Sequence, residues 1–382
     1  RYLEEALCDE YGGEIAEMTV IGVTGTNGKT TTCYLISQAL CSIGIKCAYI
    51  GTIGFYMGEK IRSLPNTSVD ICSLYELLLE AREAGYMTVA LEASSQGLAL
   101  GRLNTISFDI GIFTNLTEDH LDYHKTMDNY AAAKRMMFEH IKPGGCALLN
   151  ADDPSYGRFM LEKNQNYTYG LESGDYILKY CPPGPDRKRD FTLSMNGRKV
   201  TGKTSLSGRH NMYNLLACCA ALDKLGVTGD DIAAAAGKLC EPDGRFQTIE
   251  HEGRLIIIDY AHTPDAMEKV FDAAAEMTPG DTYAVFGCTG DREREKRPEM
   301  TRIGLSRSKM AVLTDDDVHD EDEQQIFDDM LRGNELTNYE ICPDRRKAIE
   351  RGLALAGAGD TLLILGKGHE DFIIKGKERI PH

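Results

Sequence analysis

The chain has 382 residues, of which 42% are hydrophobic and 26% charged, with 38 glycines. This composition is typical of a soluble, loop-rich enzyme of two to three domains and excludes a disordered or fibrous chain. The formal net charge of −17, without a sustained Lys/Arg stripe, argues against a nucleic-acid-binding surface. No apolar run reaches the ~20 residues of a membrane span, and no signal peptide opens the chain. Twelve cysteines without a Cys-x-x-Cys pair predict reduced, buried thiols in a cytoplasmic protein.

From residue 18 onward, apolar strands alternate with helices, which predicts parallel α/β structure. Residues 176–207 differ, because short alternating segments are separated by the turn signals Pro182-Pro183-Gly184-Pro185 and Asn196-Gly197. They predict antiparallel hairpins. In this half of the chain we expect strands at 19–24, 88–92, 110–113 and 147–150, and helices at 31–43, 129–141, 211–225 and 231–239.

A second α/β block begins near residue 244, after the polar stretch Glu241-Pro242-Asp243-Gly244. The expected fold is α/β: a central domain at 18–242 with a parallel sheet and a hairpin subsheet, then a Rossmann-like domain at 243–382. Residues 1–17 are interpreted as a linker or the remnant of a preceding domain. In the second block we expect strands at 255–260, 283–288, 310–314 and 361–365, and helices at 264–277, 323–331 and 344–356.

The segment 20–32 runs from a strand through a Gly-rich turn into a helix, which is typical of a phosphate-binding loop. Gly25 and Gly28 let backbone amides approach phosphates, Lys29 neutralises charge, and Thr30 can bind Mg²⁺. Val23 stands where the commonest form of the motif has its first glycine. A purely structural turn is disfavoured, because Gly-Lys-Thr at a helix start has little packing value.

Two further segments suggest metal chemistry. Glu92 ends an apolar strand, where open α/β sheets bind ligands, although such a glutamate is more often a solvated strand end. His120 and His124 stand among three acids after another buried strand, ahead of a helix that carries Lys134. This cluster suits a metal and phosphate site better than a core.

These segments resemble the central domain of the Mur ligases in order and spacing: GTNGKTTT at 25–32, EASS at 92–95, and TNLTEDHLDYH with NYAAAK at 114–134. Later motifs extend the resemblance over nearly the whole chain: GRHNMYN at 208–214, GR at 244–245, DYAHTP at 259–264, FGCTGDR at 286–292 and GKGHE at 366–370. The chain is most similar to the branch that makes UDP-N-acetylmuramoyl-tripeptide for peptidoglycan. The resemblance implies an ATP-dependent ligase that joins a diamino acid, such as L-lysine or meso-diaminopimelate, to the D-Glu of UDP-MurNAc-L-Ala-D-Glu. The substrate carboxylate first takes the γ-phosphate, and the incoming amine then displaces it. We expect a monomer.

The resemblance also implies roles for individual residues, with Lys29, His120 and Lys134 as the catalytic ones. Two Mg²⁺ ions are implied, one held by Thr30 and Glu92, the other by His120 and a carbamate on Lys134, which would turn a cation into an oxygen ligand. ATP is implied to contact Gly25, Thr26, Asn27, Gly28, Lys29, Thr30, Thr31, Asn211, Asn214, Arg245, Asp259 and His262. The muramoyl peptide is implied to contact Thr67, Ser68, Ser94 and Arg102. The amino acid is implied to contact Arg292, Asp316, Asp317, His319, Gly366 and Glu370. Without the resemblance, Asn211 and Asn214 equally suit the first turn of a helix.

The chain departs from this family where Asp316-Asp317-Val318-His319 replaces Asp-Asn-Pro-Arg, the mark of diaminopimelate users. No arginine is left for a distal carboxylate, so lysine, ornithine or another amine stays open. The branch's uridine-binding domain and last helix are also missing, which suggests a piece of a longer protein. Alternatives are a Mur-like ligase of pseudomurein, cyanophycin or folylpolyglutamate type, or a nucleotide-binding module without ligase activity.

Overall fold

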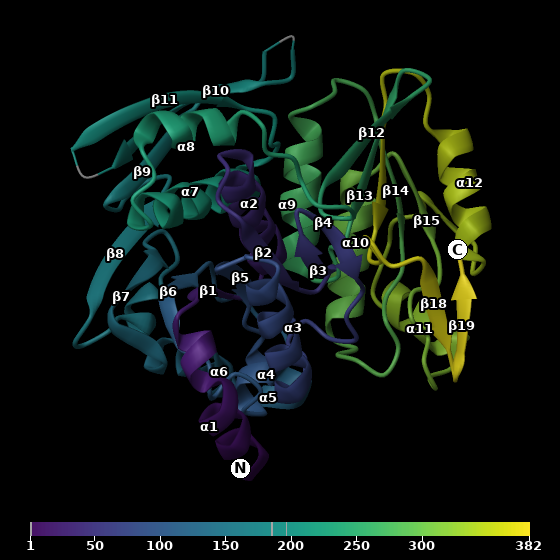
Figure 1. Cartoon of the computed structure of the whole chain (residues 1–382). Coiled ribbons are helices and arrows are strands. Elements are labelled where there is room, and N and C mark those ends of the chain that lie inside the picture. Colours follow the sequence, from purple (N-terminus) through teal and green to yellow (C-terminus); the bar gives the residue numbers. More distant parts are fainter. Residues whose placement is uncertain (1, 185, 196) are drawn as a thin grey trace. The chain divides into compact units, whose positions relative to one another are not determined.

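The computed structural model describes residues 2–184, 186–195 and 197–382. The chain forms two compact units (Figure 1). The first comprises the residues up to Leu206 together with His210–Cys240, and the second comprises Ser207–Arg209 and Glu241–His382. Two residues of the expected hairpin turns, Pro185 and Asn196, lie outside the described residues.

The first unit is built on one sheet, whose strand order is β11-β10-β9-β8-β7-β6-β1-β5-β2-β3-β4. Pairing is parallel from β2 through β9 and antiparallel at both ends. The expected hairpins are therefore present. They do not form a separate subsheet, because β9 pairs in parallel with β8 and extends the same sheet. The strands are β1 (Thr19–Thr24), β2 (Cys47–Gly51), β3 (Gly54–Met57), β4 (Glu59–Arg62), β5 (Thr88–Glu92), β6 (Phe108–Phe113), β7 (Ile141–Asn150), β8 (Gln165–Gly170), β9 (Tyr176–Tyr180), β10 (Arg189–Met195) and β11 (Arg198–Thr204).

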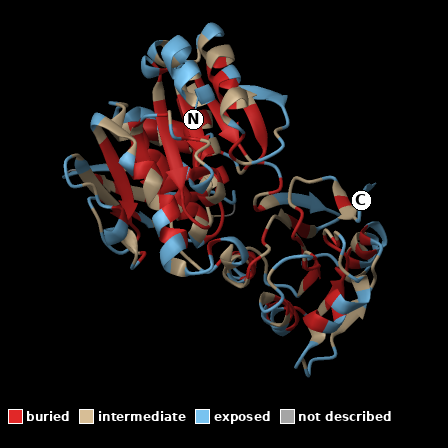
Figure 2. Ribbon diagram, turned by 90° about the horizontal axis from the view of Figure 1, so that it is seen from below, coloured by how far each residue is buried: buried red, intermediate tan, exposed pale blue. Residues whose placement is uncertain are grey.

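Helices cover both faces of this sheet, so its central strands are buried (Figure 2). Apolar side chains of α2, α7 and α8 pack on one face, and those of α1, α3, α4 and α6 pack on the other. The helices are α1 (Tyr2–Ala16), α2 (Lys29–Ser42), α3 (Ile71–Glu83), α4 (Ser95–Ala99), α5 (Leu121–His124), α6 (Met127–Glu139), α7 (Arg209–Lys224) and α8 (Gly229–Ala236), with a 3₁₀ turn at Tyr156–Phe159.

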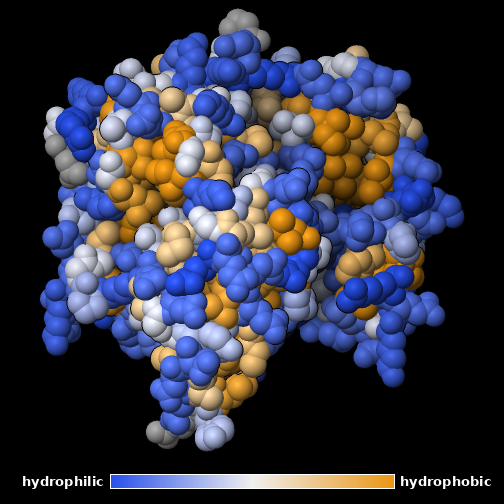
Figure 3. Space-filling view, in the orientation of Figure 1, coloured by the Kyte–Doolittle hydropathy of each residue, from blue (hydrophilic) through white to orange (hydrophobic). Residues whose placement is uncertain are grey.

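The second unit is a Rossmann-like sheet in the order β12-β13-β17-β14-β15-β16, parallel except for β12. Helices α9, α10 and α11 pack on one face and α12 on the other. Apolar side chains are partly exposed over these strands (Figure 3), and Ile258 and Ile364 on the α12 face are only partly buried. The elements are β12 (Gln247–His251), β13 (Arg254–Asp259), α9 (Pro264–Ala275), β14 (Thr282–Phe286), α10 (Lys296–Arg307), β15 (Met310–Leu313), α11 (Glu323–Leu331), β16 (Tyr339–Ile341), α12 (Arg345–Leu355), β17 (Thr361–Leu365), and a hairpin of β18 (Phe372–Lys375) and β19 (Glu378–Pro381).

The cysteines are all free, as expected, but the prediction that they are buried is wrong for Cys8, Cys181 and Cys240, which are exposed. These three lie in surface segments outside the sheet interiors. Among the described residues, no helix has the length and apolar character needed to cross a bilayer.

Candidate active site

The phosphate loop joins β1 to α2 and adopts a conformation that requires glycine. Gly25 and Gly28 have φ of 149° and 86°, and Gly28 is the residue before the first helical turn. A Cβ on Gly25 would lie 1.9 Å from the Thr114 hydroxyl oxygen. The loop is held by the segment after β6, because the Thr26 and Asn27 amides donate to the backbone and side-chain oxygens of Asn115 (2.8 and 2.9 Å). The amides at the start of α2 are thus fixed as an anion-binding cradle.

Two lysines meet at this loop. Lys29 Nζ donates to the carbonyl oxygens of Gly25 (2.9 Å) and Thr26 (2.8 Å), and Lys134 Nζ donates to the same Gly25 oxygen (2.7 Å). Lys134 is almost fully buried. Burial, together with the charge of Lys29, holds the pKa of Lys134 well below its usual range, although Asp119 opposes the shift. A larger share of neutral amine is therefore available at Lys134, the form that reacts with CO₂.

Glu92, at the end of β5, is fully buried and accepts four hydrogen bonds. The donors are the Thr30 hydroxyl (2.9 Å), the Thr52 amide (2.9 Å) and hydroxyl (3.1 Å), and the Tyr49 hydroxyl. Thr30 keeps a lone pair for Mg²⁺ while it donates to Glu92, so this oxygen pair fits a hard cation. Direct binding of the ion by Glu92 would require one of the four donors to move away.

The residues expected at the muramoyl-peptide site lie together next to Glu92. Thr67 shares a hydrogen bond with Thr52 (2.9 Å), whose hydroxyl also reaches Glu92. Ser68 and Ser94 share a hydrogen bond (3.0 Å), and Arg102 Nη1 donates to the Ser68 carbonyl (2.7 Å). Thr52 therefore connects the expected metal ligand with the expected substrate residues.

His120 and Lys134 face a common acid, Asp119. His120 Nε2 lies 3.5 Å from Asp119 Oδ2, and Asp119 acts on the charge of Lys134. His120 has a left-handed φ of 55° and precedes α5. Within the described ranges, no group of three or more His, Cys, Asp or Glu side chains is placed to hold a metal. A second Mg²⁺ here would therefore need ligands besides these side chains.

Asn211 and Asn214, in the first turns of α7, pack against the phosphate loop. Asn214 Oδ1 accepts from the Thr32 hydroxyl (3.2 Å), and Asn214 Nδ2 donates to Asn211 Oδ1 (3.0 Å). A Cβ on Gly28 would lie 2.5 Å from Asn214 Oδ1. This pair thus supports the loop as well as being available to a nucleotide.

In the second unit, the expected ATP contacts lie just before β12, at the end of β13 and in the loop after it. The Arg245 guanidinium lies over the Tyr260 ring (4.3 Å), and His262 Nδ1 lies 2.8 Å from the Tyr260 carbonyl oxygen. Asp259 accepts from the Phe246 and Ala261 amides (2.7 Å each). Burial raises the pKa of Asp259, although Arg245 and these amides oppose the shift.

The residues expected to bind the amino acid stand on three loops of the second unit. Arg292 is exposed on the loop after β14, Asp316, Asp317 and His319 are on the loop after β15, and Glu370 is on the loop after β17. Strands β17, β14 and β15 are parallel neighbours, so the three loops share the carboxyl edge of the sheet. Open α/β sheets bind ligands at this edge.

Lys367 is the cation at the centre of this edge. Its Nζ donates to Asp317 Oδ1 (2.8 Å), pairs with Glu370, and lies 4.0 Å from Asp316 Oδ1. Burial alone would lower the pKa of Lys367, but Asp316 and Glu370 raise it. Three carboxylates thus surround one ammonium group, and the buried Arg345 guanidinium acts on the same three acids, so one net negative charge is left for a further cation.

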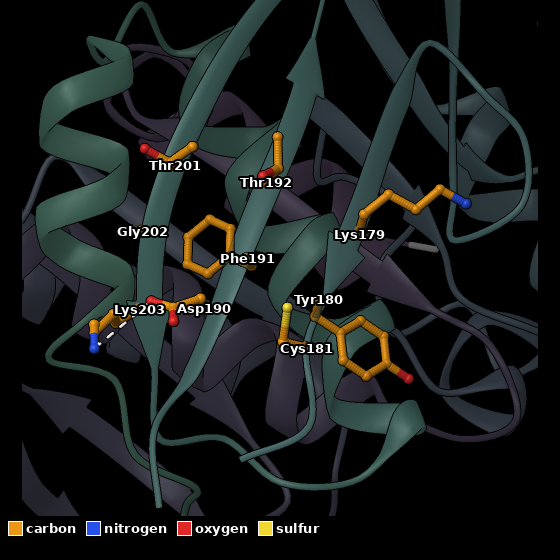
Figure 4. A pocket seen from close by; sticks show the side chains of 9 residues that line it. All are labelled: Lys179, Tyr180, Cys181, Asp190, Phe191, Thr192, Thr201, Gly202 and Lys203. Carbon is orange, nitrogen blue, oxygen red and sulfur yellow. Dashed lines mark ion pairs between the residues drawn. The ribbon is translucent and has the colours of Figure 1, made fainter. Parts of the chain in front are cut away.

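A separate depression of about 530 Å³ lies on the outer face of β9, β10 and β11 (Figure 4). Thr192 and Thr201 line it with Lys179, and Lys203 and Asp190 form a 3.7 Å ion pair beside it. Strand β10 is five strands from β1 in the sheet, about 24 Å at the usual strand spacing. This depression is therefore a separate site from the phosphate loop.

Sequence reasoning missed Tyr49, Thr52 and Lys367. Thr52 follows Gly51 at the end of β2, and that strand was not predicted, although a Gly-Thr pair after an apolar run was a usable signal. Lys367 lies inside the recognised GKGHE motif. No local pattern marks Tyr49 as a site residue, because its hydroxyl bonds Glu92, which is 43 residues away in the sequence.

Comparison with known proteins places the chain in a family. The family described as "Mur ligase middle domain" matches residues 23–222, and "Mur ligase, glutamate ligase domain" matches residues 244–368. A Bacillus cereus protein named UDP-N-acetylmuramoyl-L-alanyl-D-glutamate–2,6-diaminopimelate ligase is 37% identical over 96% of this chain and 77% of its own length. The Chromobacterium violaceum protein of that name is 39% identical over 93% and 73%.

Solved structures similar to this chain also include Mur ligases. The structure of a 2,6-diaminopimelate ligase of the same name is 34% identical, with a TM-score of 0.66 over 99% of this chain and 78% of that one. The Thermotoga maritima MurF ligase in complex with ADP has a TM-score of 0.75 over 96% and 80%, but at 20% identity it shows the fold alone. The chain therefore belongs to the Mur ligase family and is an ATP-dependent ligase.

Proposed function

We propose that the chain joins a diamino acid to the D-glutamate of UDP-MurNAc-L-Ala-D-Glu through an acyl phosphate. The Glu92–Thr52–Thr67 connection carries the proposal. It brings the phosphate loop next to the residues expected to hold the acceptor peptide, so a γ-phosphate and a substrate carboxylate can approach each other. The names of the relatives support this acceptor.

Each residue has a chemical role in the proposal. Lys29 and the amides of the phosphate loop neutralise the transferring phosphate, where charge accumulates during phosphoryl transfer. Thr30 and Glu92 would hold one Mg²⁺, and His120 with a carbamate on Lys134 would hold a second. These ions, when bound, neutralise phosphate oxygens. Arg102, Ser68 and Ser94 would orient the acceptor, with Arg102 holding the backbone on which Ser68 stands.

For the added amino acid, we propose a diamino acid whose distal ammonium is attracted by Asp316, Asp317 and Glu370. The relatives are named as diaminopimelate ligases. By the resemblance to the family, His319 stands where diaminopimelate users carry arginine, so a distal carboxylate has a weaker partner here. L-Lysine or L-ornithine is therefore expected to be used at least as well as meso-diaminopimelate. We also propose that the enzyme acts as a cytoplasmic monomer, since the chain itself supplies every candidate residue.

The test is phosphate release from ATP with UDP-MurNAc-L-Ala-D-Glu and a panel of L-lysine, L-ornithine, meso-diaminopimelate and L-alanine. Phosphate release should require the acceptor and a diamino acid, and L-alanine should give little. Absence of turnover with every diamino acid would refute this assignment while leaving the family unchanged.

A further inference from the structure

Two loops at the amino-acid end of the second unit are tied together by hydrogen bonds. Residues 287–295, after β14, carry Arg292, and residues 314–322, after β15, carry Asp317 and His319. The Gly290 amide donates to the Asp317 carbonyl oxygen (2.7 Å). A Cβ on Gly290 would lie 2.0 Å from the backbone of the second loop, so the contact is close.

Glu321 is the centre of this junction. Its Oε2 accepts from the Asp291 amide (2.8 Å), and Asp291 Oδ2 in turn accepts from the Asp320 amide (3.0 Å). Arg297 donates to both Glu321 oxygens, from Nη1 (2.9 Å) and Nη2 (2.7 Å). This fork geometry fixes the orientation of the carboxylate as well as its position.

Arg297 is itself fixed, because its side chain is fully buried in the second unit. Beyond Glu321 it donates to the Thr289 carbonyl oxygen (3.1 Å) and to Asp329 Oδ2 (3.1 Å). Thr289 belongs to the first loop, whereas Asp329 belongs to α11. The guanidinium group therefore joins both loops to the helix behind them. The Arg297 pairing lowers the pKa of Glu321 to about 2, so the carboxylate is ionised at neutral pH.

We propose that Glu321 and Arg297 are positioning residues for the amino-acid substrate: they hold the loop of Arg292 in register with the loop of Asp317 and His319. The inference rests on the proposed function, which assigns these loops to the amino acid. Neither residue touches the substrate. A change at Glu321 should therefore weaken amino-acid binding without a matching change for ATP.

The alternative is that Glu321 and Arg297 form a purely structural ion pair. A variant at Asp329 distinguishes this alternative from a positioning role. Glu321 and Asp329 both pair with Arg297, and both are nearly buried. Of these two carboxylates, Glu321 accepts a hydrogen bond from a backbone amide of the loops, and no such bond reaches Asp329 within the described residues. Both carboxylates also pair with Arg294, which lies 2.8 Å from Glu321 and 4.0 Å from Asp329. Glu321→Ala and Asp329→Ala thus both deprive Arg297 and Arg294 of a carboxylate, but only Glu321→Ala releases the Asp291 amide.

The experiment compares the two variants in the full chain by hydrogen exchange and steady-state kinetics. In Glu321→Ala, exchange at the Asp291 amide and the KM for the diamino acid should each rise about tenfold or more, with the KM for ATP within about twofold. Asp329→Ala should lower the unfolding temperature similarly but leave the exchange and the KM within about twofold. If Glu321→Ala does not fold, Glu321→Gln should give smaller changes in the same direction.

The outcomes separate the inference from the proposed function. Equal effects of both variants, or a shift of both KM values in Glu321→Ala, would overturn the positioning role. Faster exchange in Glu321→Ala with an unchanged KM for the diamino acid would also overturn the positioning role, but it would leave the proposed function intact. Failure of the wild-type chain to use any diamino acid would overturn both, and the exchange data would still show whether the loops are joined through Glu321.

Discussion

At the scale of single residues, Lys134 has the most unusual environment. It is buried beside Lys29 and close to Asp119, and its pKa is well below the usual range. A lowered pKa favours the neutral amine, which is the form that a carbamate needs. We therefore expect Lys134→Ala to lose about 10²-fold or more in kcat, the scale of a lost electrostatic contribution at a reacting phosphate. Short carboxylates such as acetate should restore part of the activity, because they replace the carbamate oxygens.

Lys142→Ala is the control for this variant. Lys142 also pairs with an acid, Asp109 (2.9 Å), but it lies on β7 away from the phosphate loop. The activity of the Lys142→Ala variant should stay near that of the wild type. Unchanged activity in Lys134→Ala, or a loss that no carboxylate relieves, would remove the carbamate from the mechanism.

His319 is the residue at which specificity should be changeable. Its φ is 54°, its amide donates to the Ile374 carbonyl oxygen (3.1 Å), and its own carbonyl oxygen accepts from Gly376 (2.7 Å). Since the backbone is fixed from both sides, His319→Arg changes the side chain without moving the loop. A guanidinium there can pair with a distal carboxylate, so kcat/KM for meso-diaminopimelate relative to L-lysine should rise about tenfold or more. His319→Gln adds no positive charge and should leave the ratio nearly constant; the same ratio in both variants would contradict a role for this position.

At the scale of elements, the entry into α2 should tolerate no side chain at Gly28. Gly28 and Gly44 have nearly identical φ values of 86° and 87°. Only Gly28 is crowded, because a Cβ there would lie 2.5 Å from Asn214 Oδ1, whereas no heavy atom lies within 4 Å of one on Gly44. Gly44→Ala should therefore cost only the left-handed backbone strain, about 1 kcal/mol of unfolding free energy. Gly28→Ala should cost roughly 2–4 kcal/mol, because overpacking adds to the strain.

Denaturant unfolding and nucleotide titration of both variants test this pair. Gly44→Ala should bind nucleotide like the wild type, while Gly28→Ala should bind it at least tenfold more weakly, since the loop amides move. Equal loss of stability in the two variants would show that Asn214 yields to the new methyl group.

Elements with a strong local signal were predicted from the sequence. Strands β1, β5 and β17 and helix α11 have the expected bounds. Helix α3 was missed although its signals are present: Asp70 caps it by accepting from the Ser73 amide, and Leu74 and Leu78 lie on its buried face. Helix α10 was missed for a physical reason, since its buried face mixes apolar residues with Arg297, Thr301 and Gly304 and so carries only a weak apolar stripe. The joining of β8 to β9 depends on two residue pairs and left no local pattern.

The residues of the candidate site also fall into those that the sequence could predict and those that it could not. Residues inside Gly-rich turns and strand ends, such as Gly28, Lys29 and Glu92, could be proposed from the chain alone. The partners that fix them could not, because Tyr49 and Thr52 meet Glu92 only when β2 pairs with β5. Pairing of this kind is decided by the whole sheet, not by a neighbouring segment.

At the scale of the whole molecule, both units place their candidate residues by the same means. The phosphate loop and Glu92 follow β1 and β5, and the loops of Arg292 and Asp317 follow β14 and β15, in each case at the carboxyl ends of parallel neighbours. The twist and spacing of a parallel sheet bring such loops to one edge, where hydrogen bonds such as that from the Gly290 amide to the Asp317 carbonyl oxygen hold them. Each unit can therefore vary its loops while the scaffold stays the same.

Glu241 stands where the chain passes from the first unit to the second, and it should make stability depend on pH. Its Oε1 accepts from the Ser207 amide (3.0 Å), in the other segment that joins the units. Burial of the carboxyl group raises its pKa from 4.5 to about 7, although the backbone hydrogen bonds oppose the shift. Because the folded state holds the proton more tightly, the stabilising contribution is complete below about pH 4.5 and is lost as the pH rises through about 7.

Glu241→Gln removes this ionisation and keeps an oxygen for the Ser207 amide. The two proteins should have similar unfolding temperatures near pH 4.5. Near pH 8 the variant should be more stable by roughly 1–3 kcal/mol, a range that allows for the partial exposure of the residue. Asp243→Asn, an exposed acid two residues away, should leave the pH profile of the wild type unchanged. Calorimetry from pH 4.5 to 8 decides the matter: parallel profiles for wild type and Glu241→Gln would mean that the carboxyl group reaches solvent and ionises freely.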